Sequence, residues 1–327
     1  MAERQALNAT FYAFRKREKG GVLLGLSLTF AIAAAVLIAG FVALFWSSIG
    51  PVITWYGQLI AAAGKNDPTA IQSIGFPTGL FTFLLGLLVW LFPFYILCAA
   101  FEAGCLRWLI HGERRGFMGL TLGAETWRVW SVYWMWVLLN IAFSMALSIV
   151  MMVLMGVVAV GAGGDPTATL TVLPVFYVVQ YSLMIYFGVR FAPAAATTIA
   201  RRRFAFFDAW TVTKGRFWAL LGSFALLYLI YLAFGLAMGA VWYVTVLGAA
   251  APDLSGIGTD PARLNQVVLE FAQAYLRSLT EPRTWAILGA LQVVGSIVAL
   301  VFYVATFGIN ARAAQVALEE GKIKAAV

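Results

Sequence analysis

Few of the residues that usually carry enzyme chemistry occur in this sequence. It holds one histidine, His111, and two cysteines, Cys98 and Cys105. A transition-metal site needs several His or Cys ligands, and a Ser-His-Asp arrangement needs a histidine held between a nucleophile and an acid. His111 lies in the polar stretch IHGERRG, where we expect a solvated surface residue rather than a base. We therefore predict no catalytic residues, no metal site and no cofactor.

Neutral polar side chains inside apolar segments are the other candidates for chemistry. Asn140, Gln180 and Gln292 each interrupt such a segment. Hydrogen bonds between helices explain such residues, and a groove for a neutral solute or a lipid headgroup is the alternative. A transporter usually places an ionisable residue near the middle of the membrane despite its cost, and we find none in these segments.

The stretch ARRRFAFFDAWTVTKGRFW, residues 200–218, mixes basic and aromatic side chains between two long apolar runs. An exposed Arg or Lys is attracted to an anionic leaflet by about 1 kcal/mol, and aromatic rings suit the headgroup level. Pro193 should bend or end the preceding helix, and Asp208 is placed to cap a short helix. We predict that the segment lies on the inner leaflet. The predicted lipid contacts are Arg190, Arg201, Arg202, Arg203, Trp210, Lys214, Arg216 and Trp218.

The elements that must position these residues are long apolar helices. Hydrophobic residues make up 62% of the 327 positions and charged residues 11%, with a mean hydropathy of +0.89, which excludes a water-soluble domain. Six segments are long enough to cross a hydrocarbon core of about 30 Å. The sequence predicts an all-α polytopic membrane protein, a single transmembrane domain over residues 1–327, with six transmembrane helices in three hairpins and short interfacial helices. The predicted spans are about 21–46, 78–100, 131–160, 171–192, 217–248 and 285–308.

The basic residues fall mostly on one side of these spans. That side holds the N-terminus, residues 101–130 and 190–216, and the C-terminus; of the 22 Lys/Arg, the exceptions are Lys65, Arg263, Arg277 and Arg283. By the positive-inside rule both termini are cytoplasmic. A net charge of +8 would suggest nucleic acid in a soluble protein, but this distribution assigns the charge to the membrane surface, and we expect no nucleic-acid partner.

The three hairpins show a weak internal repeat. Each predicted outer connection contains an Asp-Pro pair, at Asp67-Pro68, Asp165-Pro166 and Asp260-Pro261, a pair typical of helix starts. The residues expected to begin the second, fourth and sixth spans are Pro77, Pro174 and Pro282. The inner ends of those spans align at Tyr95, Tyr186 and Tyr303, each with Ala eight residues later. Because Ala, Gly and aromatic residues are common here, a true repeat and a chance alignment both stay open.

The third outer connection predicts an amphipathic helix over about 260–280. Val267, Phe271 and Tyr275 share one face, while Arg263 and Glu270 lie on the other. We expect this helix to lie on the outer interface or to pack on the outer hairpin ends, with binding of a partner as the alternative.

Residues 189–222, VRFAPAAATTIARRRFAFFDAWTVTKGRFWALLG, carry a family resemblance. An Arg and a Pro at the end of one span, an aromatic-Asp-Ala-Trp helix and Thr-Lys-Gly-Arg-Phe-Trp opening the next span resemble bacterial six-helix proteins of the glycerophosphoryl diester phosphodiesterase membrane domain group. The resemblance implies a multi-pass protein of the bacterial inner (cytoplasmic) membrane. It does not imply the phosphodiesterase activity, which needs a soluble barrel with clustered His, Glu and Asp.

These observations lead to one preferred function and one alternative. We expect a non-enzymatic integral inner-membrane protein with a structural, lipid-interacting or assembly role, whose partners are anionic membrane lipids and a protein partner or a second copy of the chain. The alternative is a transporter or permease for a small solute or lipid, with Asn140, Gln180 and Gln292 lining its groove.

Overall fold

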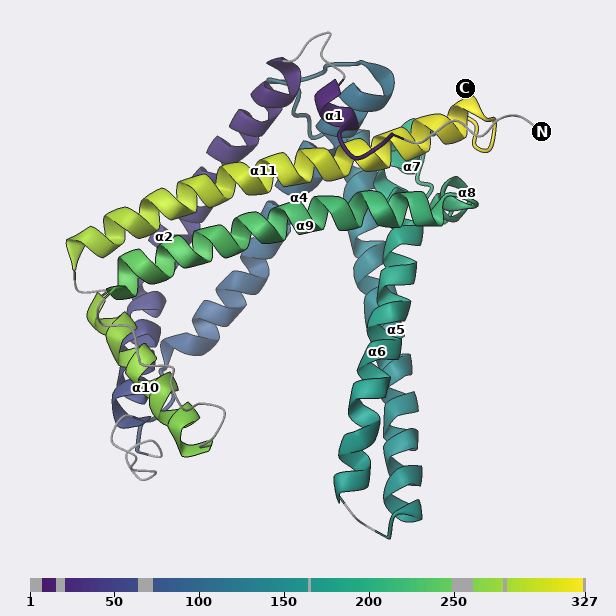
Figure 1. Ribbon diagram of the computed structural model, residues 1–327. Coiled ribbons are helices and arrows are strands. Elements are labelled where there is room, and N and C mark those ends of the chain that lie inside the picture. The colour runs from purple at the N-terminus through teal and green to yellow at the C-terminus, as the bar shows by residue number, and fades with distance from the viewer. Residues whose placement is uncertain are drawn as a thin grey trace. The chain divides into compact units, whose positions relative to one another are not determined.

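The computed structural model describes residues 8–15, 21–63, 73–163, 166–248, 261–278 and 281–325. These residues form helices joined by turns and contain no strand (Figure 1). Six of the described helices are long and apolar enough to cross a membrane, so the prediction of an all-α, multi-pass membrane protein is confirmed. The long helices are α2 (Gly21–Ala63), α4 (Gly79–His111), α5 (Ala124–Gly161), α6 (Pro166–Phe191), α9 (Phe217–Trp242) and α11 (Pro282–Glu319). The shorter ones are α1 (Tyr12–Arg15), α7 (Ala194–Ala200), α8 (Ala209–Thr213), the π-helical η1 (Tyr243–Leu247) and α10 (Pro261–Ser278).

Several helices are longer than the spans predicted for them. α2 has 43 residues, which at 1.5 Å per residue is about 65 Å, roughly twice the hydrocarbon thickness. α4 continues to His111 and α11 to Glu319, past the predicted ends near 100 and 308. Hydropathy identifies only the apolar part of a helix, which suits lipid. The backbone hydrogen bonds of the helix continue past the ends of that apolar part.

Three prolines test the predicted starts of the even-numbered spans. Pro77 precedes α4 by two residues and Pro282 is the first residue of α11, as expected. The expectation for Pro174 is wrong, because α6 begins at Pro166 and Pro174 lies inside it. A proline is tolerated within a transmembrane helix, where neighbouring groups satisfy the carbonyl that it frees. Pro261 likewise begins α10, while Asp67, Pro68, Asp165 and Asp260 lie outside the described residues.

The chain divides into two compact units. Unit 1 comprises residues 1–30, 95–227 and 303–327, and unit 2 comprises residues 31–94 and 228–302. α5 to α8 belong wholly to unit 1 and α10 wholly to unit 2, while α2, α4, α9 and α11 contribute a part to each. The two units are described in turn.

The core of unit 1 is built from three segments that are distant in the sequence. Each follows one of the tyrosines aligned by the predicted repeat, and the Ala eight residues further on is buried in every case: Ala103, Ala194 and Ala311. The N-terminal helix α1 docks on the last of these segments, since the Tyr12 hydroxyl donates to Gln315 Oε1 at 2.5 Å. Small side chains at these positions allow the helix ends to approach closely.

α5 and α6 form an antiparallel pair within unit 1 (Figure 1). Phe143 and Phe187 meet across the pair with ring centroids 5.5 Å apart. Many other large apolar side chains on the two helices are exposed, for example Met152 at 69% and Val178 at 66%. Exposed apolar side chains on helices of this length are suited to lipid contact, because lipid tails are as apolar as the residues themselves.

The connection between α6 and α9 is folded back into unit 1. α6 ends at Phe191, and Pro193 stands at the N-cap of α7, so the predicted break at Pro193 is confirmed. All seven residues of α7 are buried. Asp208 occupies the N-cap position of α8 as predicted, but its side chain does not cap the helix.

In unit 2, α2 packs on α4 through aromatic rings and glycines. The indole of Trp90 donates to Leu37 O at 3.1 Å, and its ring lies 3.5 Å from the place that a Cβ at Gly40 would occupy. α9 and α11 lie beside each other, with Tyr231 and Phe302 ring centroids 4.6 Å apart. These contacts show how aromatic side chains fill the space that small residues leave between long helices.

The amphipathic helix predicted over 260–280 is present as α10. Phe271 and Tyr275 contact the Trp242 ring at the end of α9, with centroids 6.2 and 5.9 Å away, and Val267 is buried. On the polar side Arg263 pairs with Glu270 at 3.2 Å. α10 therefore packs on a neighbouring helix end within unit 2, one of the arrangements expected from the sequence.

Candidate functional site: a caged arginine in unit 1

Arg190, in the last turn of α6, is enclosed by aromatic rings. Its guanidinium carbon lies 4.9 Å from the Trp210 ring centroid, 5.3 Å from that of Tyr186 and 5.5 Å from that of Phe217. Such cation–π contacts stabilise a guanidinium by about 0.5–2 kcal/mol each. The rings come from α6, α8 and the start of α9, so the folded-back connection brings them together. We call these four residues the Arg190 cage.

The Arg190 cage leaves part of the guanidinium without a partner. Arg190 Nε and Nη1 are buried and have no hydrogen-bond acceptor among the described residues. A buried donor without an acceptor costs about 1–3 kcal/mol, and more when the group is charged. The cage therefore offers two donors to a ligand that carries hydrogen-bond acceptors.

A pocket of about 530 Å³ opens beside the cage. Arg190, Tyr186 and Phe217 line it together with Ser182 and Trp218, from the facing sides of α6 and α9. Trp218 is 78% exposed at the start of α9. The pocket thus combines one cation with aromatic walls, and its volume is in the range of small-molecule sites.

Three other arginines among the predicted lipid contacts form ion pairs with carboxylates of the same chain. Arg201 pairs with Asp208, which explains why that carboxylate does not cap α8. Arg202 pairs with Glu113 at 2.5 Å. Arg216, which is 8% exposed, pairs with Glu320 beyond the end of α11.

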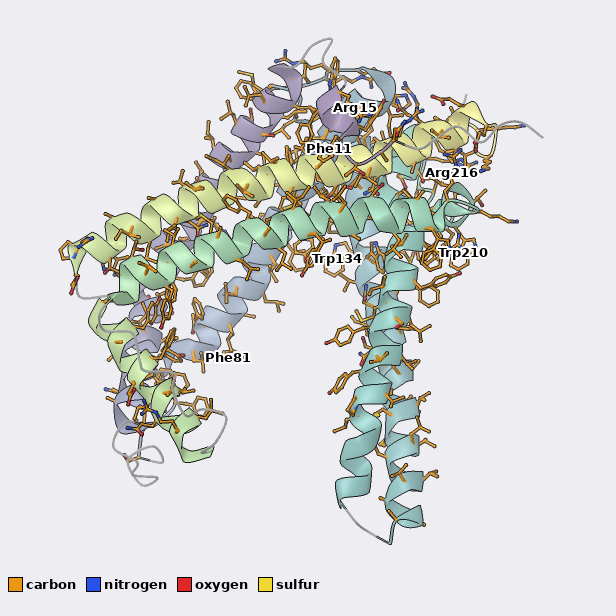
Figure 2. The ribbon with its side chains drawn as sticks, in the orientation of Figure 1. Phe11, Arg15, Phe81, Trp134, Trp210 and Arg216 are labelled. Atoms are coloured by element: carbon orange, nitrogen blue, oxygen red, sulfur yellow. The ribbon has the colours of Figure 1, made fainter. Side chains whose placement is uncertain are left out.

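The remaining predicted contacts lie on the surface of the same unit. Arg203 and Lys214 are exposed, and Trp210 is partly exposed while its ring covers Arg190. Figure 2 shows Trp210 and Arg216 at the same end of unit 1, beside α8. The structure thus divides the basic segment into caged, ion-paired and exposed cations, and contact with lipid stays a prediction for each of them.

Ion pairs near the end of α4 differ from those suggested by sequence proximity. In the sequence, Glu102 lies five residues before Arg107, and Glu125 lies three residues before Arg128. Instead Arg107 pairs with Glu125 at 2.6 Å, and Glu102 is buried and accepts a hydrogen bond from the Tyr133 hydroxyl at 2.5 Å. Glu102 and Arg107 are five residues apart on one helix, which places them on different faces.

His111 is the last residue of α4 rather than part of the connection that follows. Its Nε2 lies 3.1 Å from the carbonyl oxygen of Ile199 in α7, and the side chain is half-buried. It therefore contacts the backbone of a buried helix, whereas the sequence predicted a solvated residue. No group of three His, Cys, Asp or Glu within the described parts of the chain is placed to hold a metal ion.

The three neutral residues of the alternative groove fall in both units. In unit 1, Asn140 lines an apolar pocket of about 340 Å³ between α5 and α6, and its side-chain nitrogen donates to Trp136 O in its own helix at 2.8 Å. Gln180 lies on α6 and is half-buried. In unit 2, Gln292 donates to Ser296 Oγ at 3.3 Å, also within its own helix. Convergence of the three on one groove stays a prediction.

The sequence predicted Arg190 as a lipid contact, but it did not predict that three aromatic rings would surround its guanidinium. The aromatic residues of the cage are separated from Arg190 by up to 27 positions, and nothing in their spacing distinguishes them from a general interfacial cluster.

Comparison with models of known families finds no family that matches this chain, and comparison with curated proteins and solved structures also finds no match.

Proposed function

We propose that this protein is a non-enzymatic membrane protein that binds anionic lipid at the Arg190 cage and has a structural or assembly role. The observation that carries the proposal is the cage itself, a guanidinium held by three aromatic rings with two buried nitrogens unpaired. Because the rings fix its position, little entropy is lost when a ligand binds.

The phosphodiester of a lipid fits this arrangement. It supplies two acceptor oxygens and a negative charge, which match the planar donors of arginine. The exposed Trp218 suits the headgroup level, and the apolar surface of α6 continues from the pocket toward the acyl chains. A neutral headgroup with the same phosphate would carry a cation that the caged Arg190 repels.

We place the cage at the cytoplasmic leaflet of a bacterial inner membrane, with both chain termini on that side. The distribution of Lys and Arg along the chain supports this placement, and so does the resemblance of residues 189–222 to the phosphodiesterase membrane-domain group. Anionic lipid in that leaflet would also attract the exposed cations Arg203 and Lys214. A protein partner or a second copy of the chain would complete the assembly role.

Native mass spectrometry of the full-length protein tests the proposal. With equal amounts of phosphatidylglycerol and phosphatidylcholine, we expect the wild type to retain phosphatidylglycerol. Arg190→Gln should weaken this preference about tenfold or more, because a hydrogen bond to a charged group is lost. Arg114→Gln, which removes an exposed cation outside the cage and outside the predicted lipid contacts, is the matched control and should keep the preference. Equal retention of both lipids by the wild type, or an equal loss in the two variants, would contradict the proposal.

Transport by a permease remains the second candidate because Asn140 lines a pocket. If proteoliposomes of this protein move a fluorescent phospholipid between leaflets and Asn140→Leu abolishes that movement, transport replaces the structural role.

A further inference from the structure

A second pocket of unit 1, of about 400 Å³, is lined by four arginines. They come from α4, from the turn that follows it, from α5 and from the segment after α7: Arg107, Arg115, Arg128 and Arg202. None of them belongs to the Arg190 cage. Four guanidinium groups around one pocket repel one another unless anions lie between them.

The protein supplies only part of that negative charge. Glu125 pairs with Arg107 at 2.6 Å, and Glu113 pairs with both Arg115 at 2.6 Å and Arg202 at 2.5 Å. Two carboxylates facing four guanidiniums leave two positive charges. Arg128 makes no ion pair with any described residue. The pocket is therefore suited to a dianion.

Arg107 gives the pocket a rigid base. It is 1% exposed, and its Nη2 donates to Gly119 O at 2.8 Å and to Arg115 O at 3.3 Å. Its Nε is buried and has no acceptor in the described part of the chain. The turn it holds also carries Thr121, which lines the pocket and accepts a hydrogen bond from Arg107 Nη1 at 3.2 Å.

The start of α5 adds backbone donors to the same pocket. Gly123, at the N-cap, and Ala124, the first helical residue, both line the pocket, and no side chain caps the helix. The first N–H groups of a helix have no partner within it, and the helix dipole favours negative charge there. This feature alone would not define a site, but here it adds to four arginines and to a buried guanidinium nitrogen without an acceptor.

We propose that this pocket binds a phosphate monoester. Such a group carries a charge of about −1.5 to −2 at neutral pH and three acceptor oxygens, which match the excess charge and the forked donors of the arginines. The pocket lies at the start of a candidate membrane span, Ala124–Gly161. A lipid with a terminal phosphate and a soluble phosphorylated molecule can therefore both present this chemistry.

The experiment uses the full-length protein and two probes. Glycerol 3-phosphate is titrated into protein in detergent, and phosphatidic acid is offered in nanodiscs against a phosphatidylcholine background. Arg128→Gln is the main variant, because replacing Arg128 leaves no carboxylate without its partner. Arg115→Gln is the second variant. Arg15→Gln and Arg114→Gln are the controls, since both residues are exposed, neither lines this pocket and neither is a predicted lipid contact. Thermal unfolding of each variant is measured alongside.

We expect saturable binding of a probe that weakens about tenfold in both Arg128→Gln and Arg115→Gln and persists in the two controls. Binding of phosphatidic acid alone assigns the phosphate to a lipid, and binding of glycerol 3-phosphate assigns it to a soluble molecule. The proposal is overturned if neither probe binds saturably, or if Arg15→Gln or Arg114→Gln weakens binding as much as the pocket variants do. Because the lipid test of the Arg190 cage uses a phosphodiester and a different variant, the two proposals can fail separately.

Discussion

Arg107 holds the turn between α4 and α5 in place. Its guanidinium is shared by Glu125, Thr121 and the carbonyl oxygens of Gly119 and Arg115, so one side chain satisfies acceptors from a whole connection. A buried arginine with this many partners is typical of a structural role, and the same contacts fix the base of the phosphate pocket.

Replacing Arg107 should therefore destabilise unit 1. Arg107→Gln leaves the Glu125 carboxylate without its cation and two carbonyls without donors, which we expect to cost about 3–5 kcal/mol. Thermal unfolding in detergent measures the loss. Arg114→Gln is the matched control, because Arg114 is exposed and donates a weak hydrogen bond to the Met118 sulfur at 3.7 Å. An unchanged melting temperature for Arg107→Gln would show that the network does not hold the turn.

Two carboxyls outside the spans make the stability of unit 1 depend on pH. The hydrogen bond from Arg202 is the main reason that the pKa of Glu113 lies below its ordinary value of 4.5, and Lys322 is the first cause for the lowered pKa of Glu320. Because the pKa of each carboxyl is lowered in the folded state, each ionised carboxyl stabilises the folded protein. This stabilisation is complete above pH 4.5 and is lost as the pH falls through the lowered pKa of the carboxyl.

We therefore expect the melting temperature to fall as the pH is lowered below about 4.5. The double variant Glu113→Gln with Glu320→Gln should have a lower melting temperature than the wild type at pH 7. Its melting temperature should also decrease less than that of the wild type as the pH is lowered. Glu281→Gln, which removes an exposed carboxyl outside unit 1, should keep the wild-type slope. The same slope in the double variant and the wild type would rule out these two pairs as its source.

At the scale of the elements, a glycine in α11 allows α1 to lie close against that helix in unit 1. A Cβ added at Gly308 in α11 would lie 2.8 Å from the backbone nitrogen and the Cβ of Ala13 in α1. By contrast, Gly235 and Gly239, whose spacing in the sequence is typical of helix contacts, have no atom within 4 Å of an added Cβ. The close approach of α1 to α11 therefore requires glycine at 308.

Gly308→Ala should release α1 from unit 1. The added methyl group meets backbone, which cannot move aside as the end of a flexible side chain can, so we expect faster hydrogen exchange over residues 8–15. Gly289→Ala lies on the same helix, where an added Cβ meets nothing within 4 Å, and should leave exchange unchanged or stabilise the helix by up to about 1 kcal/mol. Equal exchange in the two variants would contradict the close contact.

The elements could be predicted from the sequence better than the site could. Hydropathy located all six spans and the polar face of α10 because lipid and water sort side chains over many residues. It missed the true end of α4, since residues 101–109 are buried by protein and not by lipid. Contacts such as Trp210 over Arg190 or Arg107 with Glu125 depend on how segments fold back, and spacing along the chain does not encode that.

At the scale of the whole molecule, the distribution of Lys and Arg along the sequence predicts that residues 190–216 and residues 260–280 face opposite sides of the membrane. We expect single cysteines at Arg203 and Leu264, both exposed positions, to react with an impermeant maleimide from opposite sides of sealed vesicles. The background variant replaces Cys98 and Cys105 by Ala. Labelling of both positions from the same side would show that the predicted threading is wrong.

The contact between α1 and α11 also sets a time order for synthesis. The hydrogen bond of Tyr12 to Gln315 joins residues 303 positions apart. At about 5–20 residues per second the ribosome needs roughly 15–60 s between them. Helix α1 therefore stays undocked until α11 has left the ribosome, and a chain that stops before residue 303 lacks the third segment of unit 1.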